Sequence, residues 1–185
     1  AYYADNDITL ITRARVTGID PAAKTVRAGD QSYPYDDLIL ATGAIPRKLP
    51  AAIGGDLGGV HVVRTIADID AMVGDVREGA RALIVGGGYI GLEAAAVAAQ
   101  RGLQVTLVEM AERILQRGAA PETSDYFRDL HRGHGVDLRE GVGLARLTST
   151  GGRVSGAELS DGSTLDCDLV IVGVGIMVVM VFVVR

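Results

Sequence analysis

The sequence predicts an α/β fold built on a parallel sheet, and three observations carry this prediction. First, an apolar strand at 82–85 runs into a glycine-rich turn, a helix-forming run at 92–101 and a second apolar strand at 105–108. Second, a pattern of short strands and Gly-containing turns occurs both before and after this unit. Third, an almost unbroken apolar run starts at Leu169, as is typical of a strand buried on both faces.

The glycine-rich turn has the spacing Gly-x-Gly-x-x-Gly, from Gly86 to Gly91. In such a turn Gly86 permits a sharp exit from the strand, and Gly88 lets the backbone approach a pyrophosphate. Gly91 lets the helix pack closely on the sheet, and the helix N-terminus offers N–H groups to phosphates. Glu109 ends the second strand, where an acid accepts hydrogen bonds from an adenosine ribose. A turn of this kind is weak evidence alone, but the complete βαβ unit predicts a dinucleotide site.

The two flanking segments resemble each other. One runs from Ile8 to Gly43 and the other from Val136 to Gly173. Each predicts a strand, an antiparallel β excursion and a buried strand that returns to the sheet. This duplication indicates the end of one nucleotide-binding domain (1–65), nearly all of a second (66–176) and an anomalous tail (177–185). Helices are expected at 66–77 and at 124–132, the latter capped by Thr123 or Ser124.

Composition narrows the class of protein. The 185 residues carry a formal net charge of −5 without long charged runs, which argues against nucleic acid as the main partner. A lone cysteine, Cys167, leaves no internal disulfide and fits a reducing, cytoplasmic compartment. The apolar run Leu169–Val184 is shorter than the ~20 residues that span a bilayer, so no membrane partner is expected. The three histidines show no metal-ligand spacing, and Cys167 is expected to pack near the base of a strand.

The motifs together resemble a known family. Tyr35-Asp-Asp-Leu-Ile-Leu-Ala-Thr-Gly43, the glycine turn with Glu109, and Asp168-Leu-Val-Ile-Val-Gly-Val-Gly175 follow the order found in two-dinucleotide flavoproteins. Over about residues 1–176 the chain is most similar to the oxygenase-coupled NADH–ferredoxin reductases. This resemblance implies a Rossmann-type three-layer ββα sandwich, in which residues 1–65 belong to an FAD domain and 66–176 form the NADH domain. We therefore expect the chain to be an internal piece of a longer protein, with FAD and NAD as the cofactors.

The resemblance also implies roles for single residues. Tyr89 would cover the flavin face until nicotinamide displaces it, and Glu93 would lie beside the carboxamide; these two are the predicted catalytic residues. As structural alternatives, Tyr89 would pack on the sheet, Glu93 would favour the helix dipole, and Arg64 and Arg117 would be solvated charges. The implied FAD contacts are Val16, Thr42, Gly43 and Arg64. The implied NADH contacts are Gly86, Gly88, Ile90, Gly91, Glu109, Arg117, Gly173 and Gly175.

The implied reaction moves a hydride from NADH to the flavin, which then passes single electrons to a [2Fe–2S] ferredoxin-type acceptor. Glu109 predicts NADH over NADPH, because a carboxylate accepts from ribose hydroxyls and repels a 2′-phosphate. Two alternatives stay open: an NADH oxidase or flavin disulfide reductase of the same architecture, and a stand-alone nucleotide-binding module without enzymatic activity. The sequence does not identify the acceptor or the oligomeric state, and it does not tell whether a redox cysteine pair precedes residue 1.

Overall fold

The computed structural model describes residues 2–178 and 183–184. The chain divides into two compact units. The larger unit is Ala44–Met177, and the smaller one combines the residues up to Gly43 with those from Val178 onward. The glycine turn and Glu109 both belong to the larger unit.

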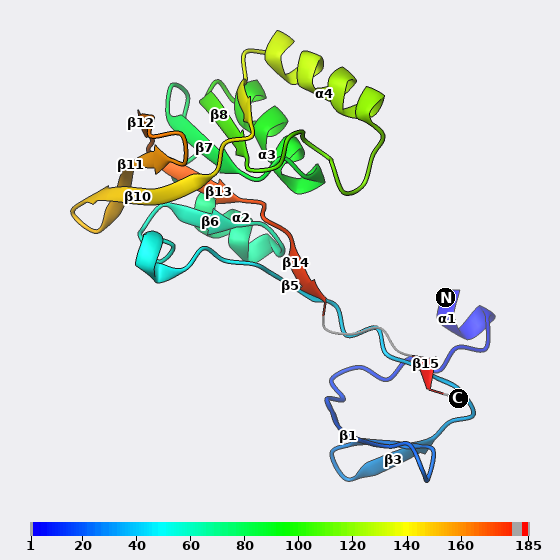
Figure 1. Ribbon diagram of the computed structural model, residues 1–185. Coiled ribbons are helices and arrows are strands. Elements are labelled where there is room, and N and C mark those ends of the chain that lie inside the picture. The colour runs from blue at the N-terminus through cyan, green and yellow to red at the C-terminus, as the bar shows by residue number, and fades with distance from the viewer. Residues whose placement is uncertain (1, 179–182, 185) are drawn as a thin grey trace. The chain divides into compact units, whose positions relative to one another are not determined.

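A parallel sheet of five strands forms the middle of the larger unit (Figure 1). The carboxyl ends of its strands meet at one edge, because Val85 pairs in register with both Val108 and Val172. Ligands of open α/β sheets bind at this edge. In spatial order the strands are β6 (Val60–Val62), β13 (Leu169–Val172), β7 (Arg81–Val85), β8 (Gln104–Glu109) and β9 (Asp137–Glu140).

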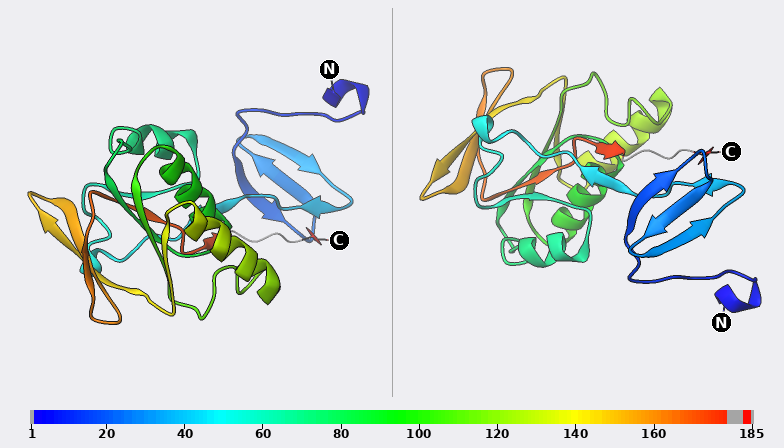
Figure 2. Two further views of the ribbon diagram at one scale, coloured as in Figure 1. Left: turned by 90° about the horizontal axis from the view of Figure 1, so that it is seen from above. Right: turned by 90° about the horizontal axis from the view of Figure 1, so that it is seen from below.

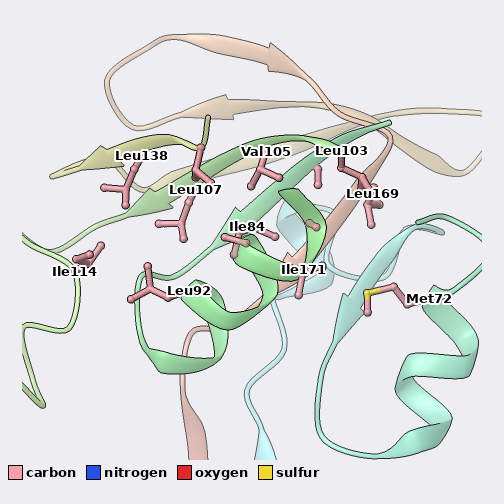
Figure 3. Packing of buried hydrophobic residues seen from close by; sticks show 14 of the residues in the cluster. Met72, Ile84, Leu92, Leu103, Val105, Leu107, Ile114, Leu138, Leu169 and Ile171 are labelled. Carbon is pink, nitrogen blue, oxygen red and sulfur yellow. The ribbon is translucent and has the colours of Figure 1, made fainter. Parts of the chain in front are cut away.

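Helices cover one face of this sheet. Alternate residues of β7 point to opposite faces, so Ala82 and Ile84 pack with Leu92 and Ala95 of the helix that follows the turn. Figure 3 shows Ile84, Leu107 and Leu92 within this cluster. His131 joins two of the helices, because its ring nitrogens lie 2.8 Å from the Phe127 carbonyl oxygen and 3.1 Å from that of Leu92. The helices are α2 (Ile66–Met72), α3 (Tyr89–Gln100) and α4 (Pro121–Gly133).

A three-stranded antiparallel sheet covers the other face, opposite the green helices in Figure 2. Leu83 and Val85 point away from the helices and pack with Val154 and Ala157 of this second sheet. The parallel sheet thus lies between the antiparallel sheet and the helices, which confirms the predicted three-layer ββα sandwich. Cys167 is fully buried just before β13, as expected. The antiparallel strands are β10 (Leu144–Thr150), β11 (Arg153–Leu159) and β12 (Thr164–Asp166).

Some predicted helix ends were wrong. The helix expected at 66–77 ends at Met72, although its start is fixed by a capping box between Thr65 and Asp68. The predicted cap of α4 at Thr123 or Ser124 was wrong, since α4 starts earlier, with Pro121 in its first turn after Ala120. Proline suits this position because its fixed φ is already helical.

The smaller unit is an antiparallel sheet with no buried residue among 2–43. It confirms the β excursion predicted before Gly43. The strand predicted at the start of the Ile8–Gly43 segment was wrong: residues 8–11 have no ladder partner among the described residues, and Ile8, Leu10 and Ile11 are about half exposed. The elements of this unit are α1 (Tyr2–Asp5), β1 (Val16–Asp20), β2 (Thr25–Ala28), β3 (Gln31–Pro34), β4 (Leu38–Ile39) and β15 (Val183–Val184), which pairs with β4.

The segment between Gly43 and α2 belongs to the larger unit. β6 lies before the predicted domain boundary at 65/66, yet it pairs in parallel with β13. The same segment holds β5 (Ala44–Pro46), which pairs with β14 (Ile176–Val178), and the short 3₁₀ helix η1 (Ala51–Ile53). The assignment of FAD to 1–65 and of NADH to 66–176 stays a prediction.

The C-terminal apolar run begins as predicted, because all four residues of β13 are buried. Of the tail predicted to be anomalous, 179–182 and Arg185 lie outside the described residues. In the part that the structure describes, no helix is long and apolar enough to cross a membrane.

Candidate dinucleotide-binding site

The glycine turn lies at the carboxyl edge of the parallel sheet, between β7 and α3. Gly86 has a φ of 107°, and a Cβ there would lie 2.5 Å from the Gly173 carbonyl oxygen. A Cβ on Gly91 would lie only 1.9 Å from the carbonyl oxygen of Gly86. Both positions therefore require glycine, one for its backbone conformation and the contact with Gly173, the other for the close approach of helix and turn.

Gly88 differs from its neighbours, because a Cβ there would meet no atom within 4 Å. It is the N-cap of α3 and has extended backbone geometry, and no side chain caps the helix. The first N–H groups of a helix have no partner within the helix. Open space in front of an uncapped helix start is the geometry that receives a phosphate group, so these residues fit the pyrophosphate of a dinucleotide.

Glu109 lies at the same edge and is tied to the turn. Its carboxylate accepts a hydrogen bond of 2.6 Å from the Gly87 N–H and one of 2.8 Å from the Ala111 N–H. The side chain is partly buried. Two carboxylate oxygens offer about four acceptor positions, so hydroxyl donors still find acceptors there. The carboxylate is thus placed beside the turn where a ribose would follow the pyrophosphate.

The loop after Glu109, residues 110–119, runs back over the glycine turn. The Leu115 N–H donates to the Gly87 carbonyl oxygen at 2.9 Å, and the buried Ile114 side chain lies against Gly87. Tyr89, 59% exposed at the start of α3, donates its hydroxyl to the Gly118 carbonyl oxygen at 3.4 Å. Arg117, one residue before Gly118, is exposed.

The remaining predicted NADH residues lie around this edge. Gly173 lies against the turn, since its carbonyl oxygen would be 2.5 Å from a Cβ on Gly86, and its N–H donates to the Val85 carbonyl oxygen at 2.8 Å. Gly175, with a φ of 100°, instead accepts from the Arg47 N–H at 3.0 Å. Ile90 and Glu93 are exposed on the first turns of α3. The structure therefore groups the glycines, Glu109 and Tyr89, while the specific roles given to Tyr89 and Glu93 stay predictions.

The predicted FAD contacts are divided between the two units. Val16, Thr42 and Gly43 belong to the smaller unit, where each is exposed. Arg64 belongs to the larger unit and precedes α2, where its N–H donates to the Asp68 carboxylate at 3.0 Å. The four FAD contacts therefore stay predictions.

A second glutamate, missed from the sequence, supports the loop. Glu140 ends β9 and pairs in register with Glu109 across the parallel ladder. Its carboxylate accepts from the Ile114 N–H at 2.8 Å and from the Arg128 guanidinium at 2.5 Å and 3.0 Å. Burial opposes ionisation of Glu140, but the bonds from Arg128 and Ile114 still hold the pKa of its carboxyl below the usual value. The signal in the sequence was an acid at the end of a strand, the same signal that identified Glu109.

These features define the class of protein as a Rossmann-type dinucleotide-binding domain. The family follows from comparison with known sequences: the model of the pyridine nucleotide-disulphide oxidoreductases matches residues 3–182, so the chain belongs to that family. This confirms the predicted resemblance. The family uses FAD and a nicotinamide nucleotide.

Two known proteins illustrate the similarity. The ferredoxin reductase subunit of 5,5'-dehydrodivanillate O-demethylase from Sphingobium sp. is 42% identical over 178 residues, which cover 95% of this chain and 43% of that protein. A crystal structure of a ferredoxin reductase from Rhodopseudomonas palustris is 38% identical, with a TM-score of 0.79 over 95% of this chain and 43% of that one. The chain thus spans less than half the length of these relatives.

Proposed function

We propose that this chain is the NADH-binding part, with a portion of the FAD domain, of a ferredoxin reductase that supplies electrons to an oxygenase system. The observation that carries the proposal is the carboxylate of Glu109 beside an open glycine turn at the carboxyl edge of the sheet. The names of the relatives support it, because the subunit from Sphingobium sp. is a ferredoxin reductase of an O-demethylase. The electron acceptor would be a [2Fe–2S] ferredoxin-type protein.

Each described residue would contribute binding or orientation. The redox chemistry, transfer of a hydride from NADH to the flavin, would be supplied by the two cofactors. The N-terminus of α3 and Gly88 would hold the pyrophosphate, and Glu109 would accept from the ribose hydroxyls. Glu93 would lie beside the nicotinamide carboxamide, and Tyr89 would cover the flavin face until nicotinamide displaces it. We assign these roles to the larger unit, and the FAD contacts Val16, Thr42, Gly43 and Arg64 complete the assignment.

The preference for NADH has support from another member of the fold. A water-forming NADH oxidase from Lactobacillus brevis is 27% identical with a TM-score of 0.70, and an engineered form of it binds NADPH. The engineered form carries five substitutions: a glycine and an aspartate 18 positions later are each replaced by alanine, two other residues are replaced by arginine, and one by serine. Gly91 and Glu109 have this same spacing. In that oxidase, loss of a carboxylate together with gain of two arginines accompanies binding of NADPH, as the charge of a 2′-phosphate predicts.

The substitution Glu109→Ala tests this proposal. NADH binding should weaken by about tenfold to a hundredfold, because hydrogen bonds to a charged group are lost. NADPH binding should stay constant or improve, so the dissociation constant for NADH divided by that for NADPH should rise. Titration of each nucleotide into the purified chain measures both constants. Glu112→Ala is the matched control, since Glu112 is an exposed acid of the same loop and its loss changes the net charge equally. An unchanged ratio of the dissociation constants for NADH and NADPH would refute the assignment of Glu109.

A flavin absorbance band distinguishes the wider alternatives. A purified chain with that band would support a flavoprotein, whereas a colourless chain that binds NADH would support a stand-alone nucleotide-binding module. We also propose a cytoplasmic location, because the single buried thiol of Cys167 fits a reducing compartment.

A further inference from the structure

The loop 110–119 is held by hydrogen bonds to three other parts of the larger unit. On one side the Leu115 N–H bonds to Gly87 in the glycine turn. On the second side the Ile114 N–H bonds to the carboxylate of Glu140 at 2.8 Å. On the third side the fully buried hydroxyl of Ser124 donates to the Ile114 carbonyl oxygen at 2.6 Å. Both backbone groups of Ile114 are therefore used by side chains from other elements.

The backbone at Leu115 shows that this loop is constrained. Its φ is 54°, in the left-handed region that branched and bulky residues rarely adopt, yet the side chain is buried. Strained backbone persists only where the surrounding contacts determine it, and it is common at ligand sites. At Leu115 the hydrogen bonds of Ile114 and the bond to Gly87 hold the backbone in this conformation. Two residues later lies the exposed Arg117.

The support from Glu140 is itself fixed. Arg128 bonds both oxygens of the Glu140 carboxylate, and its third nitrogen bonds Asp125 at 2.6 Å. The side chains of Arg128 and Glu140 are only 18% and 13% exposed. Such a bidentate pair sets the direction of the carboxylate as well as its charge. The Glu140 carboxylate is therefore fixed in the orientation in which it accepts from the Ile114 N–H.

We propose that Glu140, oriented by Arg128, is a positioning residue that holds the loop 110–119 against the glycine turn in the form that receives the adenosine end of the nucleotide. This inference rests on the proposed function, because it assumes that NADH binds at this edge. Glu140 does not contact the nucleotide and acts only through Ile114. It predicts that affinity for the adenosine half depends on a residue outside the nucleotide site.

The test uses Glu140→Ala with two probes, NADH and ADP-ribose, which lacks nicotinamide. Loss of the bond to Ile114 should weaken both by about tenfold and equally. Amide hydrogen exchange at Ile114 and Leu115 should accelerate by at least about tenfold, while strands of the core keep their protection. In Glu140→Gln the amide oxygen still accepts from Ile114, so the loss should be smaller, about threefold.

The matched control is Glu158→Ala. Glu158 is also bonded by two nitrogens of one arginine, Arg146, but it lies on β11, outside the elements that hold the loop. This control should leave the nucleotide affinities and the exchange at Ile114 unchanged.

The outcomes separate the two proposals. Unchanged exchange at Ile114, or a loss for NADH without a loss for ADP-ribose, overturns the role of Glu140 and leaves the proposed function standing. If Glu140→Ala does not fold, unchanged exchange and affinity in Glu140→Gln overturn it equally. If the unaltered chain binds neither probe, the proposed function is refuted, and the role of Glu140 in nucleotide binding is refuted with it.

Discussion

Replacing Gly91 with alanine should destabilise the larger unit, whereas the same replacement at Gly88 should leave stability nearly unchanged and weaken NADH binding. Both glycines belong to one turn, and the added group is a single methyl in each case. The difference follows from what the methyl would meet. At Gly91 it would lie 1.9 Å from the Gly86 carbonyl oxygen, and at Gly88 it would meet nothing within 4 Å.

The magnitude at Gly91 follows from the backbone contact. Unbonded heavy atoms prefer about 3.5 Å, so the helix or the turn must move by more than an ångström. Overpacking costs about 1–3 kcal/mol, and the upper end applies because the obstacle is backbone rather than a flexible side chain. Alanine gains about 1 kcal/mol over glycine inside a helix. The net loss is then about 2 kcal/mol, which lowers the melting temperature of a unit of this size by about 7 °C.

The substitution Gly88→Ala should change the free energy of unfolding little and the affinity for NADH strongly. Its φ of −80° and ψ of −177° suit any residue, and alanine at an N-cap costs only about 0.5 kcal/mol relative to glycine. The methyl group would, however, fill the space in which the pyrophosphate approaches the backbone. We expect the dissociation constant for NADH to rise by at least about tenfold, which corresponds to about 1.4 kcal/mol.

Thermal unfolding followed by circular dichroism and NADH titration, applied to both variants, check this pair of predictions. Each variant is the control of the other, because chain length, charge and added volume are identical. Equal losses of melting temperature in the two variants would contradict the reasoning. An unaltered melting temperature for Gly91→Ala, or an unaltered NADH affinity for Gly88→Ala, would contradict it as well.

Two further predictions concern groups at the other end of the parallel sheet. Asp168→Asn should be less stable than the unaltered chain at pH 7, and the difference should vanish as the pH falls from about 4 to about 2. The reason is that hydrogen bonds from the Arg81 side chain and N–H lower the pKa of Asp168 to about 2. Solvent screening limits the effect to about 1 kcal/mol, since both side chains are about two-fifths exposed. Urea unfolding at pH 7 and at about pH 2 measures the difference, and an equal deficit at both would refute the prediction. Burial raises the pKa of the Cys167 thiol to about 12, so a thiol reagent at pH 8 should modify it only after unfolding in urea, and rapid labelling of the folded chain would refute this.

The strands and the glycine turn of the βαβ unit were predictable because they depend on the local sequence pattern. Strands β7 and β8 are short apolar runs, and the turn between β7 and α3 needs glycine for its own geometry. The start of α4 was less predictable. Serine is a residue type that often caps helices, but Ser124 is buried and donates to the Ile114 carbonyl oxygen. The strand predicted at 8–11 did not form, since a strand needs a partner that its own sequence does not supply.

The candidate site was likewise predictable only where it depends on residues close together in the sequence. The sequence by itself determined that a dinucleotide turn exists and that Glu109 ends the next strand, because both lie within one βαβ unit of consecutive residues. Only the tertiary structure decided that Glu109 bonds to Gly87, that Gly173 abuts the turn, and that Glu140 holds the loop through Ile114. These contacts join residues 22 to 87 positions apart, and such pairs are selected by sheet order and packing rather than by any local preference.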